Sequence, residues 1–459
     1  MIHRYQKKGL NFVLDVNSGA VHLLDDISYA VSGLLDENMG DTCPQSIVDA
    51  LPDYTADEIR EAYDELYELK KAGQLFAQDD YIDVSRYIPV NAPVKALCLH
   101  VAHDCNLRCK YCFASTGDFG QGRKIMPPDI AKKAIDFVIA RSGVRHNIEV
   151  DFFGGEPLMA WDTVTQTVDY ARSLEEKYNK KFRFTITTNG LLLDEDKRKY
   201  INENMDNCVL SLDGRREVND EFRKTVAGTG SYDTIVPKFK ALVDERDPNL
   251  DYYARGTFTS HNLDFAEDVL SIADAGFDRL SVEPLTADPG CGYDLTEDDL
   301  PKIEAEYDRL TDIMLERKKE GKPFTFFHFM VDLDQGPCVV KRLRGCGAGY
   351  EYVAVTPDGD IYPCHQFVGK EEFKQGSVLD QSFNMDIAQK FAGMNIYSRP
   401  KCQKCWAKFY CSGGCSAANY NMNHDMNDSY DLGCEMERKR LECAIYLKAM
   451  DKICANQSK

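Results

Sequence analysis

The sequence predicts an α/β protein built around a partial (β/α)6 barrel, with a small module before the barrel and a cysteine-rich segment after it. Apolar strand candidates alternate with helix candidates from about residue 95 to 320, which is typical of βα units in a parallel sheet. The first 90 residues carry separate hairpin and helix signals. Of the 459 residues 17 are cysteines, most of which lie in one loop or in the last third of the chain.

Residues 1–90 are predicted to form a winged-helix-like module. Two short runs of alternating apolar residues flank Asn17-Ser18-Gly19, a combination that indicates a β-hairpin. Helices are expected at 27–35, 44–51 and 56–72, the last because its apolar residues recur at helical spacing. The proline-containing stretch 88–93 is expected to link this module to the barrel.

Residues 95–320 supply six strand candidates, so we predict a partial barrel instead of a closed eight-stranded one. Helices are expected between the strands, for example at 128–141, 161–177 and 265–275. A charged helix at 302–319 is expected to present a solvated face. The strand candidates are 96–101, 148–154, 183–189, 207–213, 252–258 and 279–284.

The segment 335–440 has weaker periodicity and more cysteine, glycine and aromatic residues than the barrel. We therefore expect metal ligands, more than an apolar core, to hold this segment together. A final helix is expected at 435–453, and residues 441–459 are taken as a C-terminal helical segment.

Composition excludes several classes of function. The formal charge of −20 argues against a nucleic-acid partner. No run of about 18 apolar residues occurs, so no membrane partner is expected. The first residues lack the apolar stretch of a secretion signal, so we expect a cytoplasmic protein.

Cysteine spacing indicates metal binding. A disulfide framework is the alternative, but such frameworks suit small secreted domains. Cys105, Cys109 and Cys112 follow the first barrel strand in a single loop. Three thiolates hold three irons of a [4Fe–4S] cluster and leave the fourth iron open, whereas a structural zinc site has four protein ligands. The loop therefore favours a reactive iron–sulfur cluster over a zinc knuckle.

This C-x3-C-x2-C loop resembles the radical S-adenosylmethionine (SAM) superfamily. Gly154-Gly155-Glu156-Pro157, Thr187-Thr188-Asn189-Gly190 and Ser211-Leu212-Asp213-Gly214 follow in the order of that family, each at a strand end. The resemblance implies contacts from the GGEP motif to the methionyl amino group, from Ser211 and Arg223 to ribose and carboxylate, and from Tyr111 to the adenine. Leu285 is either an adenine contact or a core residue. The SAM-binding residues implied are Tyr111, Gly154, Gly155, Glu156, Asn189, Ser211, Arg223 and Leu285.

The later cysteines resemble the seven-cysteine SPASM extension of radical SAM enzymes. The resemblance implies two auxiliary [4Fe–4S] clusters, and three in all with the radical SAM cluster. A zinc ribbon would leave the flanking cysteines unexplained. By position, Cys402, Cys405, Cys411 and Cys434 hold the outer cluster, and Cys346, Cys364 and Cys415 hold the inner one.

The sequence departs from the sulfatase-maturase branch at two positions. Cys338 is the candidate fourth ligand of the inner cluster. Its gap to Cys346 is longer than the corresponding gap in the sulfatase maturases, so either Cys338 is a ligand or one iron of the cluster stays open. In that branch an Asp that serves as a base directly follows the cysteine that matches Cys364. This chain has His365 at that position. No catalytic base is assigned, and His365 is the candidate. The other cysteines have no ligand spacing and are expected to be buried thiols: 43, 98, 208, 291, 443 and 454.

The whole chain resembles the maturases of six-cysteines-in-forty-five peptides, through Val13–Asp26, Gly336-Pro-Cys, Gly345-Cys-Gly-Ala-Gly and Tyr362-Pro-Cys-His-Gln-Phe-Val-Gly. The N-terminal module resembles the element that binds a leader peptide as an added strand, with a packing or dimerisation domain as the alternative.

This resemblance implies an enzyme that installs thioether crosslinks in a Cys-rich precursor peptide through a 5′-deoxyadenosyl radical. It also implies a one-electron donor such as flavodoxin or ferredoxin and a low-oxygen setting. Two other functions stay open. One is a maturase making a carbon–carbon crosslink or oxidising a residue, and the other is a non-enzymatic iron–sulfur electron-transfer protein.

Overall fold

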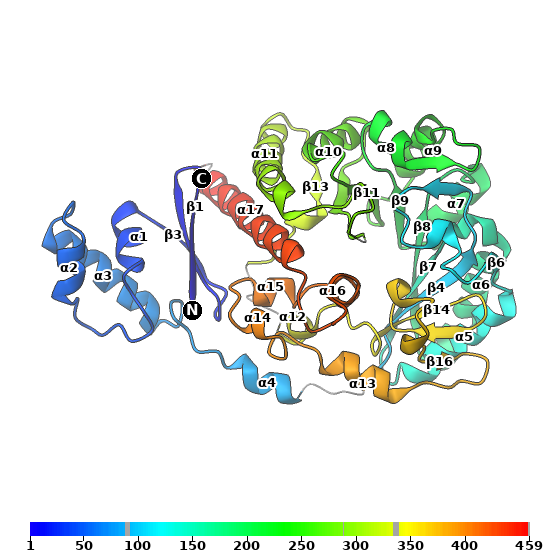
Figure 1. The fold of residues 1–459 in the computed structure, drawn as a ribbon, viewed down its shortest axis with the longest axis horizontal. Coiled ribbons are helices and arrows are strands. Elements are labelled where there is room, and N and C mark those ends of the chain that lie inside the picture. The colour runs from blue at the N-terminus through cyan, green and yellow to red at the C-terminus, as the bar shows by residue number, and fades with distance from the viewer. Residues whose placement is uncertain (88–91, 288, 334–338, 458–459) are drawn as a thin grey trace.

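The computed structural model describes residues 1–87, 92–287, 289–333 and 339–457. The N-terminal module and the barrel lie at opposite ends of the molecule, with the short helices of the cysteine-rich segment between them (Figure 1). Most of the linker expected at 88–93 lies outside the described residues. Within the described residues, no helix combines the length and the apolar character needed to cross a membrane.

The N-terminal module is an antiparallel sheet followed by helices. Strands β1 (Ile2–Lys7), β2 (Leu10–Asp15) and β3 (Val21–Leu24) pair in the order β1-β2-β3. The hairpin expected around Asn17-Ser18-Gly19 therefore joins β2 to β3. The three expected helices form as α1 (Asp26–Ser32), α2 (Gln45–Ala50) and α3 (Ala56–Lys71), and an unexpected helix, α4 (Tyr81–Tyr87), follows.

All six expected barrel strands are present and lie side by side in parallel. The second to fifth of these strands alternate between buried and more exposed residues, because one face packs under the helices and the other faces the barrel interior, whereas the first strand is buried almost throughout. In chain order they are β4 (Ala96–His103), β7 (Asn147–Gly154), β8 (Lys181–Thr188), β9 (Asn207–Ser211), β11 (Asp251–Phe258) and β12 (Arg279–Pro284). The predicted partial (β/α)6 architecture is thus confirmed.

The helices expected after the first, second and fifth strands form close to their predicted bounds. The charged helix, α11, is more than a solvated element, because Ile303, Tyr307 and Leu310 are buried and it packs on the last helix. The barrel helices are α5 (Pro128–Arg141), α6 (Trp161–Tyr178), α7 (Glu195–Asn204), α8 (Arg216–Phe222), α9 (Tyr232–Asp244), α10 (Phe265–Asp274) and α11 (Leu300–Lys319).

Further strands extend the barrel sheet beyond the six. At one edge β13 (Thr325–Phe326) pairs with β12, and at the other β14 (Tyr352–Val355) pairs in parallel with β4. Strands β15 (Asp360–Tyr362) and β16 (Gly376–Ser377) continue from β14. The cysteine-rich segment is therefore continuous with the barrel sheet. Three small strands complete the set: β5 (Leu107–Cys109), β6 (Lys124–Ile125) and β10 (Arg223–Thr225).

Short helices form the rest of the cysteine-rich segment, and a long one closes the chain. The last helix begins four residues earlier than expected, at Asp431, and packs Ile445 and Tyr446 against the N-terminal sheet. The helices are α12 (Val339–Arg344), α13 (Met385–Gly393), α14 (Pro400–Gln403), α15 (Lys408–Cys411), α16 (Ser416–Asn423) and α17 (Asp431–Gln457). The division into units at 1–90, 95–320, 335–440 and 441–459 stays a prediction.

Candidate functional site

A cavity of about 260 Å³, the strand-end cavity, lies at the carboxyl ends of the parallel strands. This is the end at which α/β barrels place their sites. The structure brings together here every SAM-contact residue expected from the sequence, the first three cysteines and His365. The predicted residues that line the cavity are Cys105, Cys109, Tyr111, Cys112, Gly154, Gly155, Glu156, Asn189, Ser211, Arg223, Leu285 and His365.

Two glycines let the end of β7 approach the first cysteine loop. A Cβ on Gly154 would lie 2.2 Å from the carbonyl oxygen of Ala102, and a Cβ on Gly155 would lie 2.2 Å from that of Asp104. No side chain fits at such distances. Gly154 also has φ of +126°, a conformation that glycine adopts without strain. The glycines of the GGEP motif are therefore required by the backbone itself.

Glu156 is fully buried and connects the ends of two strands. Its carboxylate accepts hydrogen bonds from the backbone N–H of Leu158 at 3.0 Å, the hydroxyl of Thr188 at 2.8 Å and the backbone N–H of Asn189 at 2.7 Å. Burial raises the pKa of Glu156 to about 7, although these bonds oppose the rise. The carboxylate fixes the turn after β8 against the turn after β7.

Asn189 links that turn to the cysteine loop. Its amide nitrogen donates to Asn106 Oδ1 at 2.8 Å and lies 3.6 Å from the sulfur of Cys105. The side-chain oxygen accepts from the backbone N–H of Leu191. Asn189 therefore orients the cysteine loop through direct contacts.

Asp213 is a site residue that the sequence analysis did not assign, although it stands inside the Ser-Leu-Asp-Gly motif. The buried carboxylate accepts from the hydroxyl of Tyr111 at 2.5 Å and pairs with Arg223 Nε at 3.0 Å. Burial opposes the charge of Arg223, but Asp213 and Tyr111 raise its pKa overall. Asp213 thus holds two of the expected SAM contacts in position. Leu285 is buried, so it serves the core as well as the cavity.

Two further charged residues face the cavity. Arg255 on β11 forms a two-bond ion pair with Glu283 on β12, with Nε–Oε1 of 3.1 Å and Nη2–Oε2 of 2.6 Å. His365 is half-buried, and its Nδ1 lies 3.2 Å from the hydroxyl of Tyr352. Burial, and then Arg255, lower the pKa of His365 to about 4. The imidazole is therefore neutral near pH 7.

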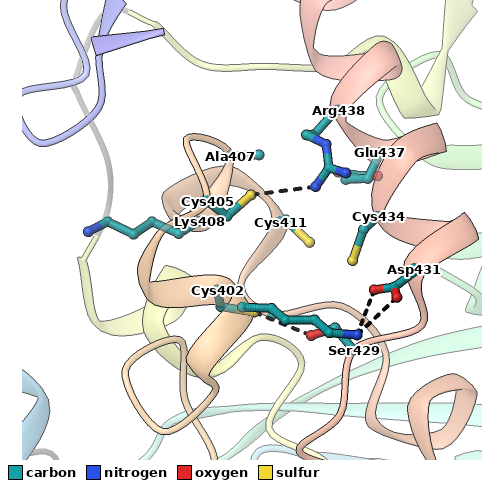
Figure 2. A pocket seen from close by; sticks show the side chains of 12 residues that line it. Cys402, Cys405, Ala407, Lys408, Cys411, Ser429, Asp431, Cys434, Glu437 and Arg438 are labelled. Carbon is teal, nitrogen blue, oxygen red and sulfur yellow. Dashed lines mark hydrogen bonds and ion pairs between the residues drawn. The ribbon is translucent and has the colours of Figure 1, made fainter. Parts of the chain in front are cut away.

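The four cysteines expected to form the outer group line one cavity of about 190 Å³, the four-cysteine cavity. Figure 2 shows their sulfur atoms directed into the space between α14, α15 and the start of α17. Arg438 lies 3.9 Å from the sulfur of Cys405, and Lys401 pairs with Asp431 at the rim. The four residues are Cys402, Cys405, Cys411 and Cys434.

The inner group also comes together. Cys346 and Cys415 each raise the pKa of the buried Cys364, after burial itself, and Cys346 likewise raises that of Cys415. Cys338 lies outside the described residues. Next to this group a cavity of about 370 Å³, the junction cavity, shares Cys411 and Cys434 with the four-cysteine cavity. It shares Glu283, Pro284 and Thr286 with the strand-end cavity.

The cysteine groups supply the thiol ligands that iron–sulfur clusters use. Among the described residues, no group of three or more His, Cys, Asp or Glu side chains is arranged to hold one metal ion. The four-cysteine cavity has room for several waters. Burial, and after it Glu437 and neighbouring thiols, raise the pKa of Cys411 to about 12. Burial, and after it Glu156 and neighbouring thiols, raise the pKa of Cys105 to about 12 as well. Iron cations would offset this cost, because metal ligation requires thiolates.

The expectation of buried thiols for the remaining cysteines is partly wrong. Cys98, Cys208 and Cys443 are buried, and the Lys7 ammonium donates to the Cys443 sulfur at 3.3 Å. The other three are partly or fully exposed, since they lie in loops or near the end of the last helix. They are Cys43, Cys291 and Cys454.

A family model described as the radical SAM superfamily matches residues 99–249, which contain the first cysteine loop and the three strand-end motifs. Residues 99–249 of the chain are therefore a radical SAM domain. A second model, the SPASM iron–sulfur cluster-binding domain, matches residues 346–406. Cys411, Cys415 and Cys434 lie beyond that match, yet the structure places them beside the matched cysteines. Together these domains imply SAM and multiple [4Fe–4S] clusters as cofactors.

The chain is also similar to individual proteins over most of its length. A cysteine-type anaerobic sulfatase-maturating enzyme of Clostridium novyi is 25% identical over 72% of this chain and 90% of that enzyme. The structure of anSMEcpe with bound AdoMet and Kp18Cys peptide aligns with a TM-score of 0.63 and 20% identity, over 78% of this chain and 99% of that one. Streptococcus suis SuiB bound to S-adenosylmethionine aligns with a TM-score of 0.53 and 18% identity, over 94% of this chain and 98% of SuiB.

Proposed function

We propose that this radical SAM protein modifies a ribosomally made, Cys-rich precursor peptide by joining a cysteine sulfur to a carbon of another residue. One observation carries the proposal: the strand-end cavity and the junction cavity share Glu283, Pro284 and Thr286 in their walls, and Cys415 of the inner group lines the junction cavity. A peptide carbon beside SAM and a peptide sulfur beside the inner group would therefore occupy adjoining spaces.

The residues of the strand-end cavity fit SAM and a cluster with one open iron. Cys105, Cys109 and Cys112 would hold that cluster, and the backbone around Gly154 and Gly155 would receive the methionyl end. When bound, SAM and its cluster supply hydrogen-atom abstraction from carbon. The residues that would hold SAM are Tyr111, Gly154, Gly155, Glu156, Asn189, Ser211, Arg223 and Leu285.

The auxiliary clusters would take the two other cysteine groups. Cys346, Cys364 and Cys415 would hold the inner cluster, with Cys338 or an open iron completing it. Cys402, Cys405, Cys411 and Cys434 would hold the outer one.

His365, the candidate base, would accept a proton from a peptide thiol. It lines the strand-end cavity, and burial and Arg255 keep it neutral. A neutral imidazole has one bare nitrogen that accepts a proton. Tyr352 at 3.2 Å from Nδ1 orients the ring.

The N-terminal module would bind the leader of the precursor. Within the described residues β3 pairs with β2 alone, so its outer edge has free backbone groups for an added strand. SuiB, whose likeness covers 94% of this chain, has also been solved bound to its precursor peptide SuiA. An electron donor such as flavodoxin or ferredoxin would approach the four-cysteine cavity, where Lys401 is exposed beside the rim. We place this chemistry in a low-oxygen cytoplasm.

Mass spectrometry after anaerobic incubation tests the proposal. The cluster-loaded protein is given SAM, a reductant and a Cys-rich precursor peptide with its leader. Thioether formation removes about two mass units per crosslink and blocks an equal number of thiols from alkylation. Mass loss with all thiols still reactive would instead indicate a carbon–carbon crosslink or residue oxidation. Absence of SAM cleavage would favour an electron-transfer protein and sink the proposal.

A further inference from the structure

Arg255 and Glu283 form an ion pair in the wall between the strand-end and junction cavities. Both residues line the strand-end cavity, and Glu283 also lines the junction cavity. They extend from neighbouring parallel strands, β11 and β12, whose register sets Thr257 opposite Glu283. The two bonds engage Nε and Nη2 of the guanidinium, one on each carboxylate oxygen. The pair is thus held in a fixed orientation at a wall that the two cavities share through Glu283.

Stability does not explain this pair. The Arg255 side chain is 45% exposed and that of Glu283 is 35% exposed. Ion pairs with such exposure stabilise a fold by roughly 0–1 kcal/mol. Because two charges that face a cavity add so little to the stability of the fold, we infer that they have a role in binding.

The pair retains hydrogen-bonding capacity on its open side. In the part of the chain that the structure describes, Nη1 of Arg255 has no hydrogen-bond partner, and each oxygen of Glu283 accepts one bond, from Arg255. A guanidinium has five N–H donors and a carboxylate has about four acceptor positions. A donor and an acceptor therefore stand next to each other at the cavity surface.

We propose that Arg255 and Glu283 bind the main chain of one extended residue of the substrate peptide. Arg255 donates to its carbonyl oxygen, and Glu283 accepts from its N–H. In an extended chain these two groups of one residue point to the same side, which matches the adjacent donor and acceptor. This inference rests on the proposed function and adds a contact that is independent of the peptide's side chains.

Such a contact would also direct the flanking side chains. Successive side chains of an extended segment point to opposite faces. The side chain of the anchored residue would therefore point to one face of the segment, and the side chains of its two neighbours would point to the other. The pair would thereby direct side chains of adjacent peptide residues towards different sides of the shared wall.

A charge swap separates a binding role from a packing role. Glu283→Gln, Arg255→Gln and the double variant R255E/E283R are compared in the full cluster-loaded chain with SAM but without reductant. The probe is a fluorescein-labelled Cys-rich core peptide, followed by anisotropy, with SAM affinity measured by equilibrium dialysis. Either single change is expected to weaken peptide binding about tenfold and to leave SAM affinity within about twofold. The double variant should restore the ion pair and the melting temperature but not peptide binding.

The same two strands offer a matched control. Arg279 of β12 pairs with Asp251 of β11 at 2.9 Å at the opposite end of these strands. Arg279→Gln removes an ion pair of the same kind there and should leave peptide binding unchanged.

Peptides with one N-methylated amide sharpen the test. Methylation of the one amide whose N–H Glu283 accepts should weaken peptide binding to the wild-type chain. The same methylation should not weaken binding to the Glu283→Gln variant. Recovery of binding in the double variant would overturn the inference, as would a parallel loss of SAM affinity. A wild-type chain that binds the peptide but forms no thioether contradicts the proposed function alone.

Discussion

His3 of β1 stacks face to face on Trp406, with ring centroids 3.8 Å apart and an interplanar angle of 1°. Trp406 directly follows Cys405, which lines the four-cysteine cavity, and His3 Nε2 also lies 2.9 Å from the carboxylate of Glu442 on α17. Val16 of the N-terminal module packs in one apolar cluster with Cys402. The predicted leader-binding module therefore forms one wall behind the outer cysteine group.

Trp406→Leu should loosen this wall. The variant keeps an apolar side chain but loses ring stacking and part of the buried area, at a cost of about 1–3 kcal/mol. We expect lower stability to urea and faster loss of iron from the outer cluster during anaerobic dialysis. Trp161→Leu is the control, since this other tryptophan of the chain packs on Tyr200 in the barrel. Equal iron loss in both variants would refute a specific role for the stack.

Gly155→Ala should disrupt the strand-end cavity. Its Cβ would meet the Asp104 carbonyl oxygen at 2.2 Å, so the backbone before Cys105 must move. We expect SAM affinity to fall about tenfold or more, because overpacking of this kind costs about 1–3 kcal/mol. Gly40→Ala places a Cβ where nothing lies within 4 Å and is the matched control. Wild-type SAM affinity in the Gly155 variant would show that the loop adapts.

The barrel could be predicted from the sequence because its signals are local. The second to fifth strands alternate between buried and more exposed residues, and helices with their own period lie between the strands. The cysteine groups could be inferred from spacing by family resemblance. Residues of the strand-end cavity could also be predicted from local signals, because short sequence motifs stand at the ends of three of the strands.

What the sequence did not show depends on contacts between distant segments. Strand β14 pairs with β4, although more than 250 residues separate them in the sequence. Strand β14 has only four residues, which is too short for a pattern that would predict this pairing. Asp213 stands within a short motif, but its hydrogen bond from Tyr111 forms only in the folded loop. Arg255 and Glu283 resemble ordinary exposed positions of alternating strands, so only the structure reveals that their exposed side faces a cavity.

Cys434→Ser tests the outer ligand set. A chain with three [4Fe–4S] clusters carries about twelve irons, and losing one cluster leaves about eight. We expect that decrease by iron analysis after anaerobic reconstitution. Cys454→Ser, an exposed cysteine outside the three groups, should keep the full content. Full iron content in Cys434→Ser would remove this residue from the ligand set.

His328→Gln should reduce the acid sensitivity of the fold. Arg440 Nη1 lies 3.2 Å from His328 Nδ1, which must therefore accept, and Nε2 lies 3.2 Å from the Ser281 hydroxyl. Burial, and then Arg440, lower the pKa of His328 from 6.5 to about 3. Because this folded-state pKa is below the unfolded value, the neutral ring stabilises the fold above pH 6.5. That stabilisation is lost progressively as the pH falls towards 3.

The measurement is the urea midpoint at pH 7 and pH 5. A Gln amide accepts from Arg440 and donates to Ser281 at both values. When the pH falls from 7 to 5, the free energy of unfolding of the variant should decrease by about 1–2 kcal/mol less than that of the wild-type chain. His146→Gln, at an exposed position, should behave like the wild type. An unchanged pH dependence in His328→Gln would show that another group controls acid unfolding.

Cys415→Ser should separate SAM cleavage from crosslinking. Cys415 lines the junction cavity and interacts with Cys346 and Cys364, whereas the cysteines of the strand-end cavity are Cys105, Cys109 and Cys112. We expect the variant to form 5′-deoxyadenosine while thioether product falls at least about tenfold, because the sulfur partner loses its site. Cys105→Ser should abolish both products, since the first cluster needs all three thiolates. Normal crosslinking by Cys415→Ser would mean that the inner group takes no part in forming the carbon–sulfur bond, and the junction cavity would then lose its role in the proposed reaction.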